Sequence, residues 1–166
     1  MRIISHRGNL TGPNVDKENT ESYLLAALGC EYDIEFDLWY FADKFWLGHD
    51  QPTHSFSFDH ILTWSAKYSN QKFYVHCKNM WALEKMTGEL PSNVIPFFHD
   101  IDQCILLRDG YIWVHPNAIA SSSIKDKSIA VFSACKTAHY DIYYDLNFRN
   151  YYGICTDYPE DVRNSI

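Results

Sequence analysis

The sequence predicts an α/β fold with seven to eight parallel strands. Strand-length apolar runs alternate with helix-like segments, and no linker, low-complexity tract or repeat interrupts that alternation. This order is typical of parallel strands joined by crossover helices. A complete eight-stranded barrel needs about 250 residues, whereas the chain has 166. Either one unit is very short or the barrel is incomplete, and on pattern alone a doubly wound sheet fits as well.

Seven short runs rich in apolar and aromatic residues are expected to be strands: Arg2–Ser5, Tyr32–Leu38, Phe73–Cys77, Val94–Phe98, Tyr111–His115, Ile129–Phe132 and Tyr152–Thr156. The segments between them are expected to be helices: Thr20–Leu28, Asp59–Tyr68, Met80–Glu89, Ile101–Leu107 and Ile142–Phe148. Thr20 is expected to begin the first helix and Gly29 to end it. We expect residues 1–166 to form one domain, because this length suits a single core.

Composition limits the classes of function. A formal net charge of -7 argues against a nucleic-acid binder, whose affinity depends on clustered Lys and Arg. No apolar run approaches the ~20 residues of a membrane span. The five cysteines show no C-x-x-C spacing, and no basic-then-apolar leader opens the chain. We therefore expect a cytoplasmic protein; the sequence indicates no oligomeric state.

The strand Tyr32–Leu38 is unusual because it alternates apolar and acidic residues. One face carries Ile34, Phe36 and Leu38, and the other carries Asp33, Glu35 and Asp37. Three neighbouring carboxylates inside a covered sheet would each cost several kcal/mol unless compensated. A divalent cation compensates them well. The simple alternative is a half-exposed antiparallel strand with an acidic outer face.

The strand Phe73–Cys77 shows a similar inversion, with Tyr74, His76 and Lys78 on one side. If it lies beside the acidic strand, His76 can be a third metal ligand. Lys78 would then stand at the carboxyl end of its strand, where barrel active sites are assembled. Taken singly, His76 also fits a structural histidine, and Lys78 a solvated strand end.

Two further polar groups follow strands. His6-Arg7-Gly8 ends the first strand and offers a proton carrier and a fork-shaped phosphate binder. Gly48-His49-Asp50 follows the acidic strand, and Asp50 can orient the ring of His49. Each tripeptide alone is a weak signal.

In their order these segments resemble the glycerophosphodiester phosphodiesterases. That family's pattern is H-R-G, P-E-N-T, E-x-D, H-D, E-x-K and T-D-x-P. The chain has these counterparts: His6-Arg7-Gly8, Glu18-Asn19-Thr20, Glu35-Phe36-Asp37, His49-Asp50, His76-Cys77-Lys78 and Thr156-Asp157-Tyr158-Pro159.

The resemblance implies a TIM-type (β/α) barrel, here short or incomplete, that hydrolyses a small-molecule phosphodiester with one divalent metal ion. It implies His6 and His49 as the catalytic acid and base. Arg7 and Lys78 would bind the phosphate, and Glu35, Asp37 and His76 the metal. Glu18 and Asn19 would support the loop around His6. In the family the 2-hydroxyl of glycerol attacks phosphorus, and water then opens the cyclic phosphate.

Two departures leave alternatives open. His76 stands where the family has Glu, which weakens binding of Mg²⁺ or Ca²⁺ and favours Mn²⁺ or Zn²⁺. Lys17 stands where the family usually has Pro. A non-catalytic relative that binds a phosphorylated ligand, and a lyase that stops at the cyclic phosphate, are the competing interpretations. The aromatics Trp39, Tyr40, Trp46 and Trp113 fit an apolar entrance for a lipid chain, although core or rim packing explains them more simply.

Overall fold

The computed structural model contains one ten-stranded sheet and is described for residues 1–115, 120, 123–132 and 148–166. The strands are β1 (Arg2–His6), β2 (Asp33–Phe41), β3 (Lys44–Leu47), β4 (His54–Phe56), β5 (Phe73–Cys77), β6 (Val94–Phe97), β7 (Cys104–Leu106), β8 (Ile112–Val114), β9 (Ser128–Phe132) and β10 (Gly153–Thr156). The helices are α1 (Glu21–Gly29), α2 (Phe58–Lys67), α3 (Met80–Lys85) and α5 (Pro159–Ser165), and short 3₁₀ turns span Lys125–Lys127 and Phe148–Asn150.

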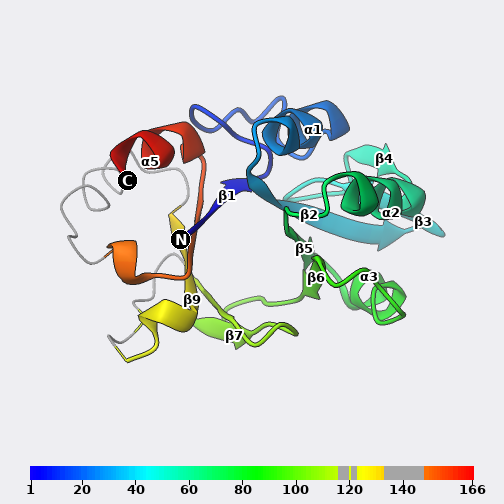
Figure 1. Ribbon diagram of the computed structural model, residues 1–166. Coiled ribbons are helices and arrows are strands. Elements are labelled where there is room, and N and C mark those ends of the chain that lie inside the picture. The colour runs from blue at the N-terminus through cyan, green and yellow to red at the C-terminus, as the bar shows by residue number, and fades with distance from the viewer. Residues whose placement is uncertain (116–119, 121–122, 133–147) are drawn as a thin grey trace.

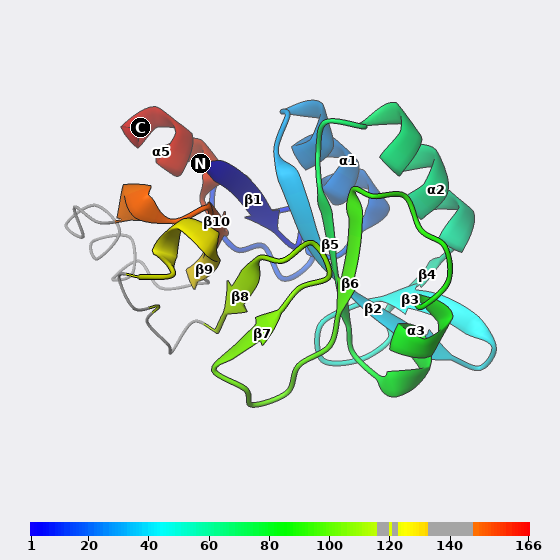
Figure 2. The ribbon, with the colours of Figure 1, turned by 60° about the horizontal axis from the view of Figure 1, so that its bottom comes forward.

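The sheet is mixed and open. Strands β6, β5, β2, β1, β10, β9 and β8 are parallel neighbours in that order. The pairs β2–β3, β3–β4 and β7–β8 are antiparallel. Among the described strands, β6 pairs only with β5 and β7 only with β8. The sheet therefore curls into a half-barrel whose two edges do not meet (Figures 1 and 2).

The prediction of a TIM-type barrel is therefore wrong. The edges β6 and β7 are not hydrogen-bonded to each other, three strand pairs run antiparallel, and four short helices accompany the ten described strands. A complete barrel needs a crossover helix for each strand, and a chain of 166 residues is too short to supply them. Instead, β2 turns back into β3 at Ala42 and Asp43, which both have positive φ, 50° and 56°. This is a type I′ hairpin turn without its usual Asn-Gly signature.

All seven predicted strands overlap observed ones, but the prediction of a helix at Ile101–Leu107 is wrong. Its centre forms β7, which returns to β8 through a turn at Asp109-Gly110. Gly110 has a φ of 86°, a conformation that glycine adopts without strain, and the Asp-Gly pair is the hairpin signal that the prediction overlooked. The predicted helix Ile142–Phe148 lies outside the described residues except for its last member, which begins a 3₁₀ turn.

Apolar side chains on the two faces of the sheet form separate clusters, of which two are the largest. Ile34, Phe36 and Leu38 of β2 pack on the outer face with helix residues such as Leu24 and Ile61. The inner face holds a second cluster that includes Tyr74, Ile95 and Trp113. Helices α1, α2 and α3 lie on the β2–β6 side, and α5 lies near β1 (Figure 1). In the described part of the chain no helix has the length and apolarity to cross a bilayer.

Candidate functional site

The acidic side chains of β2 point to the concave, inner face of the sheet. Asp33, Glu35 and Asp37 are 3%, 2% and 1% exposed, and β2 has parallel neighbours on both sides at this level. The simple alternative, an acidic outer face on an antiparallel strand, is therefore excluded. Asp33 lies away from the other two: Arg2 binds both of its carboxylate oxygens. Glu35 and Asp37 lie together farther along the strand, and Oε2 of Glu35 has no hydrogen-bond partner.

Strand register places a histidine beside the two remaining carboxylates. His76 of β5 is the register partner of Asp37, and Glu35, Asp37 and His76 each offer a donor atom within 4.8 Å of the others. The Nδ1 atom of His76 lies 3.0 Å from Oδ1 of Asp37 and 4.0 Å from Oε1 of Glu35. Donor atoms that bind one ion at about 2.0–2.3 Å lie roughly 3 Å or more apart. The three side chains therefore fit one divalent cation.

An unpartnered oxygen supports that fit. Oε2 of Glu35 is buried and has no hydrogen-bond partner, although buried carboxylate oxygens are normally satisfied. Nε2 of His6 lies 3.8 Å from it, beyond hydrogen-bonding distance. A bound cation would satisfy this oxygen, since hard cations prefer carboxylate ligands.

The ring of His76 is held in one orientation. Its Nε2–H donates a 3.5 Å hydrogen bond to the carbonyl oxygen of His99. The ring also stacks on Phe97 and His99, with centroids 5.1 and 4.4 Å away. Metal-binding histidines typically donate their second ring nitrogen to a carbonyl or carboxylate in this way. Nδ1 is thereby directed at the two carboxylates.

Glu35 and Asp37 differ in their electrostatic surroundings. Burial, and then the charge of Asp37, raise the pKa of Glu35 above its ordinary value. Burial would also raise the pKa of Asp37, but a hydrogen bond from His76 and the charge of Lys78 lower it instead. Lys78 Nζ and Arg7 Nε both lie 3.3 Å from Asp37. Two cations therefore stand beside the acidic centre, where they can also bind phosphate oxygens.

His6 at the end of β1 is held by a residue to which the sequence assigned no role. Its Nδ1 lies 2.7 Å from Oδ1 of Asp157, which also accepts a 2.7 Å hydrogen bond from Asn9. Burial would lower the pKa of His6, but the Asp157 hydrogen bond and the Glu35 charge raise it. Sequence reasoning missed Asp157 and Asn9. The Thr-Asp-x-Pro motif at the end of the chain was the available signal for Asp157, and nothing in the sequence marked Asn9.

The loop after β1 is shaped to deliver Arg7 and Asn19. Both have positive φ, 55° and 56°, a conformation that asparagine tolerates but that is strained for arginine. Gly8 has a φ of 85°, and a Cβ there would lie 2.9 Å from the backbone of Tyr23 in α1. Only glycine therefore lets the loop pass this close to the helix.

Glu18 and Asn19 hydrogen-bond to two charged residues of the centre. Glu18 accepts a 3.0 Å hydrogen bond from the guanidinium of Arg7. The Asn19 side chain donates to the Asp37 carboxylate and accepts from the Asp37 backbone N–H, both at 2.9 Å. These contacts fix the positions of one cation and one carboxylate of the centre.

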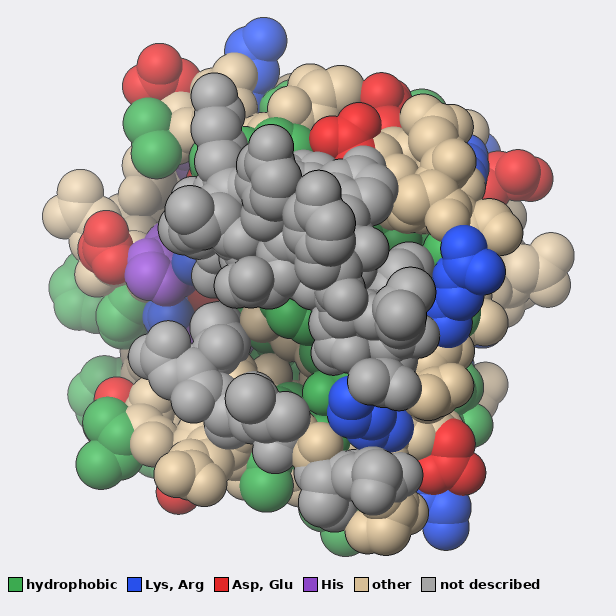
Figure 3. Space-filling model, turned by 90° about the vertical axis from the view of Figure 1, so that its left-hand side faces the viewer, with side chains coloured by type: hydrophobic (Ala, Val, Ile, Leu, Met, Phe, Trp, Pro, Cys, Tyr) green, Lys and Arg blue, Asp and Glu red, His purple; other side chains and the backbone are tan. Residues whose placement is uncertain are grey.

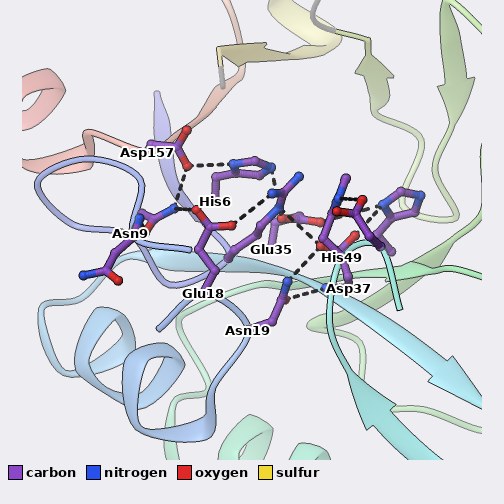
Figure 4. A network of polar contacts seen from close by, with 12 residues as sticks. His6, Asn9, Glu18, Asn19, Glu35, Asp37, His49 and Asp157 are labelled. Carbon is purple, nitrogen blue, oxygen red and sulfur yellow. Dashed lines mark hydrogen bonds and ion pairs between the residues drawn. The ribbon is translucent and has the colours of Figure 1, made fainter. Parts of the chain in front are cut away.

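His49 lies at the exposed rim of this group. Its side chain is 42% exposed, and its Nδ1 lies 2.6 Å from Asp50. It lines a cavity of about 220 Å³ with Arg7, Glu18 and Asn19. Burial lowers the pKa of His49, as do the charges of Arg7 and Lys78, while Asp37 acts in the opposite direction. In Figure 4, His6 and Asp157 lie toward one end of the network and His49 toward the other.

The structure thus brings most of the predicted site residues into one contact network: His6, Arg7, Glu18, Asn19, Glu35, Asp37, His76 and Lys78. His49 joins them through the shared cavity. On the face shown in Figure 3, the described acidic and basic side chains are interspersed, and a histidine is open to solvent. Such a centre offers metal ligands, cations for an anionic group, and two proton carriers. Comparison with protein-family models and with curated proteins finds no match to this chain.

Proposed function

We propose that this chain is a metal-dependent phosphodiesterase that hydrolyses a glycerophosphodiester or a related small or lipid-derived diester. The observation that carries the proposal is the buried Glu35–Asp37–His76 cluster with an unpartnered carboxylate oxygen. Arg7 and Lys78 stand beside it. Phosphodiester cleavage needs charge neutralisation at the phosphate oxygens together with proton removal and delivery. The ordered motifs that resemble the glycerophosphodiester phosphodiesterases support the same reaction.

The residues have separate roles in this proposal. Arg7 and Lys78 bind the phosphate oxygens, and His6 and His49 transfer protons on opposite sides of the phosphorus. Asp157 holds the ring of His6 through Nδ1, so that its Nε2 faces the centre. Glu35, Asp37 and His76 would hold one divalent ion, which supplies positive charge to the phosphate. The imidazole among these ligands favours Mn²⁺ or Zn²⁺ over Mg²⁺ or Ca²⁺.

The proton balance needs both histidines. One takes the proton of the attacking 2-hydroxyl as its oxygen bonds to phosphorus, and the other donates a proton to the departing alcohol oxygen. The product of this step is a cyclic phosphate, which water opens when the two histidines exchange roles. A lyase would release the product after the first step.

Phosphorus NMR of glycerophosphocholine and a lysophospholipid, incubated with the protein and each of Mg²⁺, Ca²⁺, Mn²⁺ and Zn²⁺, tests the proposal. We expect metal-dependent release of glycerol phosphate from glycerophosphocholine and of an acylglycerol phosphate from the lysophospholipid, and the loss of both products in His6→Ala. His60→Ala is the matched control, because His60 lies on α2 and contacts Glu21 rather than the centre. Full activity in His6→Ala would refute the assigned role. A cyclic phosphate that persists would identify a lyase.

A non-catalytic ligand-binding protein is the second candidate, and one observation favours it. Asp37 is already contacted by His76, Lys78 and Arg7. The charge of one of the two carboxylates in the centre is therefore compensated without an ion. Titration calorimetry separates the two candidates. Absence of divalent-metal binding, together with intact diester after incubation, would favour the binding protein.

A further inference from the structure

An apolar cavity of about 490 Å³ opens next to the polar site. Its walls are mainly Trp39, Phe41, Trp46, Pro52 and Trp81, and these five residues define the aromatic pocket. They come from the β2–β3 hairpin, the loop before β4 and the start of α3. The volume lies within the range of about 300–1,000 Å³ that small-molecule sites occupy.

The aromatic pocket adjoins the cavity that Arg7 and His49 line. Gln51 lines both. The indole N–H of Trp39 donates a 2.6 Å hydrogen bond to the carbonyl oxygen of Gly48, which ties the pocket wall to the loop that carries His49. A ligand whose phosphate lies against Arg7 therefore has the aromatic pocket within reach of its next few atoms.

The lining of the aromatic pocket selects an apolar occupant. Asn79 also lines it, but its amide is engaged by the Tyr40 carbonyl and the Ala82 N–H, at 3.0 and 2.8 Å. Gln51 is the remaining amide that could hydrogen-bond a ligand, and none of the lining residues, all in the described part of the chain, carries a charge. Aromatic rings can bind a quaternary ammonium, but no carboxylate lines this pocket to balance its charge, and a nucleobase would find few hydrogen-bond partners for its polar edge. A hydrocarbon chain needs neither a counter-charge nor a hydrogen-bond partner.

The solvent exposure of the pocket walls also favours an apolar occupant. Trp81 is 63% exposed and Phe41 58%, so that large apolar surfaces of the pocket remain in water. Burying such surface is favourable in proportion to its area. An occupant that covers both rings gains binding free energy without the loss of an existing contact.

We propose that the aromatic pocket binds the single hydrocarbon chain of an amphiphilic phosphodiester whose phosphate lies in the adjoining polar cavity. The inference rests on the proposed function only for the position of the phosphate group, and not for the binding of the hydrocarbon chain. It names the substrate class of the site as a one-chain, lysophospholipid-like diester rather than a chain-free glycerophosphodiester.

Alkylphosphocholines of increasing chain length, kept below their micelle-forming concentrations, are the probe. They are phosphodiesters with an alkyl chain but lack the 2-hydroxyl that would attack phosphorus, so they report binding without turnover. The dissociation constant is measured by tryptophan fluorescence and calorimetry. We expect it to fall by up to about fourfold for each methylene group that enters the pocket.

Two variants and one control locate the effect. Trp81→Ala and Phe41→Ala should each weaken the dependence on chain length and leave the affinity for the shortest probe unchanged. Leu106→Ala is the control: its side chain is 75% exposed on β7 and lines none of these cavities, so the wild-type dependence should remain.

Affinity that is independent of chain length would overturn the inference, as would an unchanged dependence in both pocket variants. Binding to phospholipid vesicles but not to the monomeric probes would also overturn it, and would indicate a bilayer-docking surface instead. A chain-length dependence in a protein that binds no metal and cleaves no diester would support the pocket and refute the proposed function. The two failures are therefore distinguishable.

Discussion

Replacement of Glu35 by Gln should stabilise the metal-free protein. The substitution keeps the size of the side chain but removes a buried charge whose Oε2 has no hydrogen-bond partner. Burial and Asp37 raise the pKa of Glu35, which means that folding disfavours its charged form despite the attraction of His6. An unsatisfied buried group costs about 1–3 kcal/mol, and more when it is charged, so exchanging the carboxylate for a neutral amide should raise the free energy of unfolding by about 1 kcal/mol or more. For a domain of this size, each kcal/mol shifts Tm by about 2–4 °C.

The sign of the pH dependence follows from the same shift. The pKa of Glu35 is raised above its ordinary value of 4.5, so the folded wild-type protein loses stability as pH rises through the raised pKa. The glutamine side chain of the variant has no proton to lose. The advantage of Glu35→Gln should therefore be smallest near the ordinary pKa and should grow toward neutral pH.

Bound metal should make wild type more stable than Glu35→Gln, the reverse of the order expected without metal. A ligand that binds only the folded state at 100 times its Kd adds about 2.7 kcal/mol. Wild type should gain this stabilisation from Mn²⁺ or Zn²⁺, and Glu35→Gln should lose most of it with its missing carboxylate. Thermal unfolding with chelator and with saturating metal measures both effects. Glu89→Gln, which changes an exposed glutamate, is the matched control. Its Tm should equal that of wild type both with chelator and with saturating metal.

A lower Tm for Glu35→Gln than for wild type in chelator would refute the reasoning, because it would show that the carboxylate is satisfied without an ion. A wild-type Tm that no divalent metal changes would refute the metal centre itself.

Three further predictions concern other parts of the molecule. Asp157→Asn should lower kcat by roughly 10²- to 10⁴-fold and shift the pH profile to lower values, because His6 loses the partner that raises its pKa; an unchanged pH profile would contradict the orienting role. Gly8→Ala should lower Tm, since its Cβ would meet the Tyr23 backbone at 2.9 Å with φ at 85°; Gly88→Ala, which meets nothing within 4 Å, is the control. Iodoacetamide applied to the native protein and mapped by mass spectrometry should modify the exposed thiols and spare the buried ones, whose pKa burial raises, in one case to about 12; the expected order is Cys30 and Cys104 before Cys77 and Cys155.

Local pattern was enough to predict much of the site. The alternation along Asp33–Leu38 revealed Glu35 and Asp37 on one face, because side chains of a strand alternate strictly between its two sides. The same rule placed His76 and Lys78 together. Gly8 indicated a sharp turn after the first strand, and the structure shows why: a Cβ there would lie 2.9 Å from the backbone of Tyr23. Each of these inferences needs only residues that are close in sequence.

The rest depended on contacts between distant segments. His6 and Asp157 lie 151 positions apart, so no local pattern could pair them. The open edges β6 and β7 are equally a tertiary result, because a parallel strand pattern does not state whether its two ends meet. The hairpin turn at Ala42-Asp43 has positive φ at both residues, a conformation that is rare for alanine, and sequence reasoning expected no turn of that type there.

The sequence by itself therefore determined which side chains share a strand face and where glycine must turn the chain, because both follow from backbone geometry within a few residues. Only the tertiary structure decided that the carboxylate face is the inner one, that Asp33 is neutralised by Arg2, and that Glu35 keeps an oxygen without a partner. Burial and electrostatic balance are sums over neighbours from the whole chain. Burial and electrostatic balance therefore decide whether an acidic strand is a solvated surface or a candidate metal centre.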